Sequence, residues 1–257
     1  MRYCLIRIAY DDSFHGFQVQ PTVRTVQGEI LRALAPLGIK KVYGSSRTDS
    51  HVRSSSSIVE VEYPDVKKVC KILDSIKGIA VTGFYQSEEF VKLRKVLEKE
   101  YVYLTLRSLE SERVGKAIDE FLQGKMQSFS KDPSKRVAIT RITFFSGKQH
   151  TILVFRGRSF SWNFVRISAQ SIIERSDGTI GDEEWQGLLA GRIRARYKGR
   201  AENLILCQTV APFGFNKYES RNLPLLKARM YQDFYWLSGI GDPVVDLNDS
   251  YRFIRSL

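Results

Sequence analysis

The sequence predicts an α+β protein built from two similar units, each an antiparallel sheet that carries helices on one face. Segments that alternate apolar and polar residues predict half-buried strands, and segments with apolar residues every three or four positions predict helices. These segments follow one another in the order β-α-β-β-α-β twice along the 257 residues. A chain of this length can bury a proper core, as one large domain or as two smaller ones.

The first unit is expected to contain four strands and two helices. Thr25 is a candidate N-cap for an amphipathic helix over 25–34, and Asp65 is a candidate N-cap for a second helix. The apolar stripe of this second helix consists of Val66, Val69, Cys70, Leu73 and Ile76. The strands are expected over residues 3–10, 39–43, 57–63 and 79–85.

Residues 87–98 are charged and lack an alternating pattern, so we expect a boundary there between an N-terminal domain 1–88 and a C-terminal domain 98–257. In the second unit, strands are expected over 101–106, 138–145, 151–155 and 204–210, and helices over 112–122, 160–174 and 183–189. The tail beyond Pro212 is expected to pack onto the body through Phe213, Phe215, Tyr231, Phe234, Tyr235 and Trp236.

The chain carries 40 Lys and Arg against 28 Asp and Glu, a net charge of +12, which favours phosphate-bearing partners. The alternative is a charge that serves solubility or reflects an origin in high salt or at high temperature. No apolar run approaches the ~18 residues that a membrane span needs, and the N-terminus lacks the apolar core of a signal peptide. We therefore expect a cytoplasmic protein without a membrane partner.

The cysteines and histidines indicate no metal site. Three of each are scattered along the chain without metal-ligand spacing: Cys4, Cys70, Cys207, His15, His51 and His150. We interpret the cysteines as buried small hydrophobic residues and expect neither a metal nor a cofactor.

The most informative stretch is Arg47-Thr48-Asp49-Ser50-His51-Val52, which precedes the serine run at 54–57. A carboxylate at a polyanion-binding surface repels phosphate, so we interpret Asp49 as a reactive group. The neighbouring Arg47 stabilises the ionised form, and an ionised, partly desolvated carboxylate can act as a nucleophile or general base. Taken alone, the tripeptide Arg-Thr-Asp fits a salt bridge in a surface turn better than a reactive site.

Arg166 lies on the helix expected over 160–174, beside Trp162 and Asn163 and away from the apolar stripe that begins at Phe160. At the edge of a packed helix it is placed to meet a carboxylate from elsewhere. The alternative is a solvated arginine.

Tyr101 and Tyr103 share one face of their expected strand, and one of them is a candidate stacking platform for a base. The alternative is a pair of ordinary core and surface aromatic residues. Further on, five cations occupy alternate positions and would point the same way if the segment were extended, as contact with a phosphate backbone requires. They are Arg192, Arg194, Arg196, Lys198 and Arg200, and a solvated edge is the alternative.

Five motifs in this order resemble the tRNA pseudouridine synthase A (TruA) family over most of the chain. They are Gly16-Phe17-Gln18-Val19-Gln20, Thr25-Val26-Gln27-Gly28, Ser46-Arg47-Thr48-Asp49, the strand Lys99-Glu100-Tyr101-Val102-Tyr103, and the helix start at 159–166 with its Ser-Phe-x-x-Asn-x-Val-Arg pattern. The resemblance implies a pseudouridine synthase fold, in which the two units join into one extended mixed sheet around a basic cleft. It also implies a homodimeric isomerase that needs no cofactor and converts uridine to pseudouridine in the anticodon stem-loop of tRNA, at positions 38, 39 or 40.

The resemblance also implies roles for individual residues. Asp49 is expected to attack the target nucleoside, and Arg166 to pair with Asp49 and keep it ionised. Arg47 is expected to displace the base and support the site. Tyr101 is expected to stack on the uracil and to accept or relay the proton lost from C5, while Leu204 lines the pocket.

Three positions depart from the family pattern around Asp49. Ser46 and His51 stand where the family has glycine, and Arg53 stands where it has histidine. Glycines at such places permit a positive φ, which histidine tolerates better than serine, so we expect an altered backbone path. Lys99 in place of arginine and Phe164 in place of glutamine or methionine are milder changes.

Two alternatives to an active isomerase stay open at this point. One is a catalytically silent or altered-specificity tRNA-binding relative, in which the loop keeps RNA affinity. The other is an unrelated basic α+β enzyme.

Overall fold

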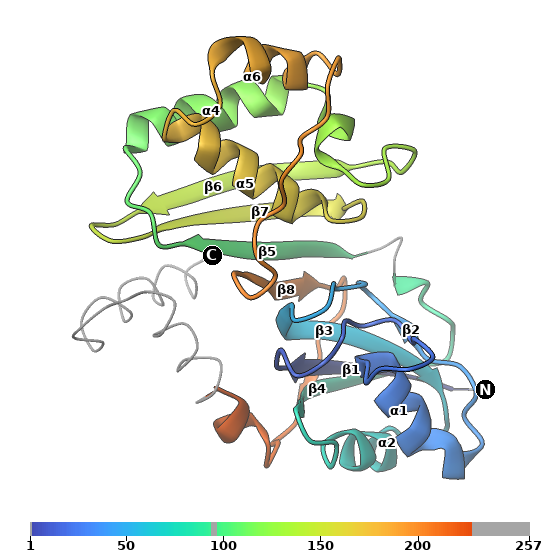
Figure 1. Ribbon diagram of the computed structural model, residues 1–257. Helices are drawn as coiled ribbons and strands as arrows, with labels where there is room; N and C mark the ends of the chain where they lie inside the picture. The colour runs from blue at the N-terminus through green and yellow to red at the C-terminus, as the bar shows by residue number, and fades with distance from the viewer. Residues whose placement is uncertain (1, 94–96, 228–257) are drawn as a thin grey trace.

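One mixed sheet of nine strands runs through the computed structural model, which describes residues 2–93 and 97–227. Along the sheet the strand order is β6-β7-β5-β8-β3-β1-β4-β9, and β2 pairs with β3 off this path. The strands are β1 (Tyr3–Tyr10), β2 (Tyr43–Gly44), β3 (Arg53–Glu62), β4 (Ile79–Ser87), β5 (Glu98–Thr105), β6 (Ala138–Ser146), β7 (Thr151–Ser159), β8 (Leu204–Val210) and β9 (Asn216–Lys217). Figure 1 shows the helices of both halves on one side of this sheet.

The helices divide into two groups, one over each half of the sheet (Figure 1). The described helices are α1 (Val26–Leu34), α2 (Val66–Leu73), α4 (Ser111–Gln123), α5 (Phe164–Ser176) and α6 (Asp182–Leu189), with 3-10 turns at Ala35–Leu37 and Met126–Phe129. The α+β prediction with helices on one face is therefore confirmed, as is the joining of both units into one sheet.

The first half packs α1 and α2 against β1, β3 and β4, which pair antiparallel. Both predicted caps are present: Thr25 Oγ1 accepts from the Gly28 N–H at 3.2 Å, and Asp65 Oδ1 accepts from the Lys68 N–H at 3.0 Å. Each cap satisfies a helix N–H that has no partner within the helix. The helix α2 ends at Leu73, three residues before the end of the predicted stripe, but Ile76 is still buried.

The strand predicted over 39–43 is wrong except for its last residue. Only Tyr43–Gly44 pairs with β3, while Ile39 and Val42 are buried without strand pairing. An alternating apolar pattern indicates that every second side chain is buried, but it does not require a strand. Here a coil segment after the 3-10 turn buries the same side chains that a strand would have buried.

The serine run 54–57 is part of strand β3 and does not lie in a solvent-exposed loop. Ser54 Oγ donates to Leu206 O at 3.2 Å, and Ser55 Oγ donates to Cys207 O at 2.7 Å. The ladder between β3 and β8 is parallel and covers only Arg53 with Ile205 and Ser54 with Leu206. These hydroxyls therefore extend the short parallel join between the two halves of the sheet.

In the second half, β5 lies between β7 and β8 in antiparallel register, and α4, α5 and α6 pack over them. The helix α5 begins at Phe164, although the sequence predicts a start at residue 160. Asn163 takes a left-handed conformation with φ of 57°, so regular helix can form only after it. Trp162 consequently lies before the helix and not on its face.

The three cysteines are free: Cys4 and Cys70 are buried as predicted, and Cys207 is half-buried. Burial raises the pKa of each thiol to about 12. Within residues 2–93 and 97–227, no group of three or more His, Cys, Asp or Glu could hold a metal ion. In the same residues, no helix is long and apolar enough to cross a membrane.

Two of the tail aromatics pack on the body as predicted. Phe213 stacks on Tyr85 with 4.4 Å between ring centroids, and Phe215 lies beside the same ring at 6.5 Å. Tyr231, Phe234, Tyr235 and Trp236 lie outside the described residues. The domain boundary between residues 88 and 98 stays a prediction.

Candidate active site

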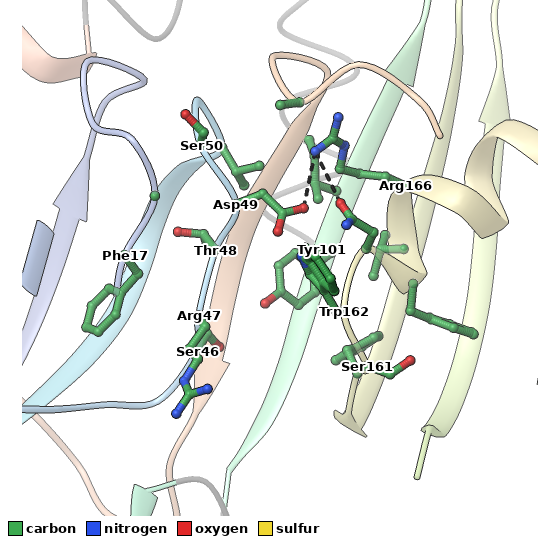
Figure 2. Close-up of a pocket in the computed structure, with 18 of the residues that line it drawn as sticks. Phe17, Ser46, Arg47, Thr48, Asp49, Ser50, Tyr101, Ser161, Trp162 and Arg166 are labelled. Atoms are coloured by element: carbon green, nitrogen blue, oxygen red, sulfur yellow. Dashed lines mark hydrogen bonds and ion pairs between the residues drawn. The ribbon is translucent and has the colours of Figure 1, made fainter. Parts of the chain in front are cut away.

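A cavity of about 1140 Å³ opens where the two halves of the sheet meet. The β2–β3 loop (residues 45–52) and residues 15–18 line it from the first half, while β5, the start of α5 and residues 198–204 line it from the second. Figure 2 shows Asp49 and Arg166 facing each other across this junction. The predicted residues Arg47, Asp49, Tyr101, Arg166 and Leu204 all border the cavity.

The β2–β3 loop is held on both sides by hydrogen bonds. Ser45 N donates to Ile58 O at 2.8 Å, and the Thr48 hydroxyl shares a 2.9 Å hydrogen bond with Tyr10 Oη on β1. Phe17 N donates to Thr48 O at 3.1 Å from the other side. Gly16 allows this close approach, because its φ is +87° and a Cβ there would lie 2.9 Å from Thr48 O. The loop is therefore a fixed support and not a surface turn.

His51, which stands where the family pattern is expected to have glycine, takes a left-handed conformation with φ of 64°. Its backbone N–H donates to Phe14 O at 3.1 Å and its Nδ1 donates to Asp12 O at 3.0 Å. A left-handed L-residue costs roughly 1–2 kcal/mol, and two hydrogen bonds of about 0.5–1.5 kcal/mol each offset that cost. Arg53, buried at the start of β3, pairs with Asp12 at 2.8 Å and ties the same corner. Ser46 has no positive φ, so its position does not need a glycine.

Asp49 forms its ion pair with Arg166 and not with Arg47. Arg166 Nη1 lies 3.2 Å from Asp49 Oδ2, and the two side chains are 10% and 23% exposed. Arg47 is exposed and points away from Asp49 (Figure 2), because Ser46 and Thr48 on either side of it turn inward. The sequence neighbour Arg47 therefore does not pair with the carboxylate, and the charge partner comes from α5, as the family resemblance implied for Arg166.

Asn163 completes the surroundings of Asp49. The oxygen and nitrogen of an amide side chain are assigned from the groups that surround them. A carboxylate can only accept hydrogen bonds, and an indole N–H can only donate one. The Asn163 amide therefore donates to Asp49 Oδ2 at 2.7 Å and accepts from Trp162 Nε1 at 3.0 Å. Both contacts of Asp49 thus fall on Oδ2. No hydrogen bond or ion pair within the described part of the chain involves Oδ1.

Arg166 also joins α5 to the segment that leads into β8. Its Nε donates to Gly199 O at 2.8 Å, and Gly199 N donates to Arg166 O at 3.1 Å. A Cβ at residue 199 would overlap Tyr103 Oη, at 2.0 Å, so only glycine fits this crossing. Arg166 is therefore a buried, oriented side chain, and the alternative of a solvated arginine is wrong.

Tyr101 lies on β5 beneath the cavity and is only 7% exposed. Its ring makes an edge contact with Phe160 at 5.0 Å between centroids. Burial raises the pKa of the Tyr101 phenol to about 12, and the Asp49 charge acts in the same direction. At neutral pH this group is a protonated hydroxyl next to an apolar surface to which Leu204 contributes.

The five alternating cations do not form an extended strand. Residues 192–200 are irregular, all five cations are exposed, and Ile193 and Tyr197 between them are exposed as well. Lys198 and Arg200 border the cavity, whereas Arg192, Arg194 and Arg196 do not.

Other cavity residues were missed by the sequence reasoning because they lie far apart in the chain. Lys99, Lys135 and Arg158 join the predicted cations, so that the lining holds seven Lys and Arg against three Asp and Glu. No local pattern connects these positions. The Asn163 contact carried one usable signal, since asparagine is among the residues that tolerate a left-handed conformation before a helix.

No family model matches the chain. Curated relatives named tRNA pseudouridine synthase A do match. The protein of Methanopyrus kandleri is 31% identical over 217 residues, 78% of this chain and 83% of the relative. That of Pyrococcus furiosus is 28% identical over 203 residues, 75% of this chain and 76% of the relative.

Among solved structures, a chain of the archaeal box H/ACA sRNP Nop10-Cbf5 complex is 13% identical with a TM-score of 0.34, over 91% of this chain and 56% of that chain. The Methanopyrus match, at 31% identity over 83% of the relative, is strong enough to assign a family. The chain belongs to the tRNA pseudouridine synthase A family.

Proposed function

We propose that this protein isomerises uridine to pseudouridine in the anticodon stem-loop of tRNA, with Asp49 as the nucleophile. One observation supports the proposal above the others: Arg166 and Asn163 both hold Oδ2 of Asp49, and no described group occupies Oδ1. A carboxylate fixed in this way presents one oriented oxygen to a substrate. Family membership supports the same reaction on tRNA.

The reaction breaks the N-glycosidic bond, rotates the uracil and joins its C5 to the sugar. The proton that leaves C5 is balanced by the proton that N1 gains, so no oxidant or second substrate is consumed. A base cannot react in this way inside a stack and must first be flipped into a pocket. The Asp49 carboxylate reacts with the sugar or with the base and is released again when the C–C bond forms.

Tyr101 and Leu204 supply the surface against which the flipped uracil would stack. With its pKa raised to about 12 by burial, the Tyr101 hydroxyl is protonated at neutral pH. It can therefore relay the proton from C5 by donating one proton as it accepts another. It cannot act as a general base that is already deprotonated before the reaction. The exposed Arg47 at the cavity rim would fill the place that the base leaves in the RNA.

Recognition of the stem-loop would depend on charge and shape. The cavity lining is basic by seven residues to three, and the exposed cations of residues 192–200 continue this charge outside it. Such a surface follows a phosphate backbone and does not read base edges. The expected targets are the uridines at positions 38, 39 or 40 of the tRNA. The enzyme is expected to be a cytoplasmic homodimer, and light scattering would measure its mass.

Tritium release from tRNA labelled at C5 of uridine tests the reaction. We expect release by the wild-type protein and none by Asp49→Asn, which keeps the shape of the side chain and removes its charge. Asp182→Asn is a matched control, since Asp182 also pairs with an arginine but lies on α6, away from the cavity. If the wild-type protein binds tRNA without releasing tritium, the protein is a silent tRNA-binding relative and the proposal fails.

A further inference from the structure

Trp162 is an exposed aromatic residue whose position is nonetheless fixed. It is 63% exposed and borders the cavity. Its carbonyl accepts from Lys131 N at 3.1 Å and from Ser130 Oγ at 3.5 Å, and its indole N–H donates to Asn163 at 3.0 Å. Because the one polar atom of its side chain already has a partner within the protein, what Trp162 offers to a ligand is an apolar aromatic face.

The indole is also coupled to the nucleophile. The Asn163 amide lies between Trp162 Nε1 and Asp49 Oδ2, with contacts of 3.0 and 2.7 Å. Asn163 reaches both neighbours from a left-handed conformation, with φ of 57°, which asparagine tolerates better than most L-residues. The aromatic face and the reacting carboxylate are therefore held by one buried amide.

The target uracil and Trp162 occupy different places. Tyr101 lies deep in the cavity at 7% exposure, whereas Trp162 is exposed at the cavity surface. The cavity of about 1140 Å³ exceeds the roughly 300–1,000 Å³ of pockets that take one small molecule, so it can hold more than a single base. Exposed aromatic faces within a basic groove are how proteins bind unstacked nucleotides.

We propose that Trp162 is the stacking platform for the base that flanks the target uridine, and that Asn163 is the positioning residue that holds this platform and Asp49 in register. This inference rests on the proposed function for the identity of the target, but it concerns a separate contact. Flipping the uridine breaks the stacking of its neighbour, and Trp162 would restore that stacking on one side.

Substitution of Trp162 tests the contact through KM and kcat for tritium release, together with the Kd for the RNA stem-loop. Base–aromatic stacking is worth about 1–3 kcal/mol, so we expect Trp162→Ala to raise KM and Kd by roughly 5- to 150-fold with little change in kcat. Trp162→Phe keeps an aromatic face and should stay within about threefold of wild type. Leu225→Ala is the control for loss of an exposed apolar side chain, since Leu225 is 60% exposed and does not border the cavity.

RNA that lacks one flanking base separates stacking from a general structural effect. On the RNA without the base that contacts Trp162, the penalty of Trp162→Ala should disappear, and wild-type affinity should fall by the same factor. A penalty of equal size on RNAs lacking either neighbour would overturn the proposal, as would an unchanged Kd for Trp162→Ala. Because Kd needs no turnover, these outcomes stand even if the wild-type protein releases no tritium, a result that would refute the proposed reaction alone.

Asn163→Gly tests the coupling, since glycine accepts the left-handed backbone and removes only the amide. We expect kcat to fall by about tenfold or more, since a hydrogen bond to a charged group is lost. Unchanged kcat with normal thermal stability would remove Asn163 from the positioning role.

Discussion

Replacing Arg166 by glutamine removes the charge partner of Asp49 while keeping a polar side chain. The substitution removes the Nη1 contact to Asp49 Oδ2 at 3.2 Å and the Nε contact to Gly199 O at 2.8 Å. If Asp49 is the nucleophile, the loss of its oriented partner should appear in the chemical step, because Arg166 borders the reacting carboxylate and is 10% exposed.

The size of the effect follows from these contacts. A hydrogen bond to a charged group is worth about 1.5–3 kcal/mol, and the lower half of that range applies because the Asp49 side chain is 23% exposed and partly screened. At 1.36 kcal/mol per factor of ten, we expect the single-turnover rate constant to fall by roughly 10- to 50-fold. The lost Gly199 contact, which is also donated by the charged guanidinium, adds about 1.5–3 kcal/mol of instability, or about 3–12 °C in Tm for a chain of this size.

Single-turnover tritium release at saturating protein measures this rate without a contribution from binding. Arg156→Gln is the matched control: Arg156 pairs with Glu100 at 2.5 Å on the sheet but does not border the cavity. The rate constant of Arg166→Lys should lie between those of Arg166→Gln and Arg156→Gln. An ammonium keeps the positive charge but cannot contact Asp49 and Gly199 at the same time as the guanidinium does. An Arg166→Gln rate constant within twofold of wild type would refute the reasoning that this pair orients the nucleophile.

Four further predictions concern the proton relay, the pH dependence of stability, the loop and the charged surface. Tyr101→Phe should bind RNA within about twofold of wild type and lose about 10²-fold or more in kcat; a normal kcat would contradict the relay. Burial raises the pKa of Tyr101 to about 12 from an unfolded value of about 10. The contribution of the Tyr101 phenol to stability should therefore be intact below pH 10 and vanish towards pH 12. Over that window, the Tm of the wild-type protein should fall more steeply than the Tm of Tyr101→Phe. His51→Gly should leave Tm within about 3 °C of wild type, because relief of the left-handed conformation offsets the lost side-chain hydrogen bond. His51→Val, by contrast, should lower both Tm and activity. Equal Tm values for the two variants would show that the loop conformation carries no strain. Neutralising the exposed cations outside the cavity, Arg192, Arg194 and Arg196, should flatten the salt dependence of Kd by up to about 0.9 per cation in contact with phosphate, and an unchanged slope would mean that this segment does not touch RNA.

Much of the fold could be predicted because its signals are local. The caps at Thr25 and Asp65 and the strands of both units depend on residues within a few positions of one another. The errors arose where one local pattern has two structural outcomes. Residues 39–43 are apolar because they are buried, and burial does not require strand pairing. The start of α5 moved because a single left-handed residue, Asn163, interrupts the helical pattern.

For the candidate site, the sequence predicted the residues Asp49, Tyr101 and Arg166 from their motifs, and all three border one cavity. The residues around Asp49 suggested the neighbouring Arg47 as its charge partner, whereas the family resemblance implied Arg166. The tertiary structure decides between them, because it places Arg166, 117 residues further along the chain, against the carboxylate. The physical reason is that the loop turns Arg47 to solvent, while the short parallel join of β3 and β8 brings the start of α5 to the carboxylate. The contact of Asn163 with Asp49 depends on the same join, because the two residues come from different halves of the sheet.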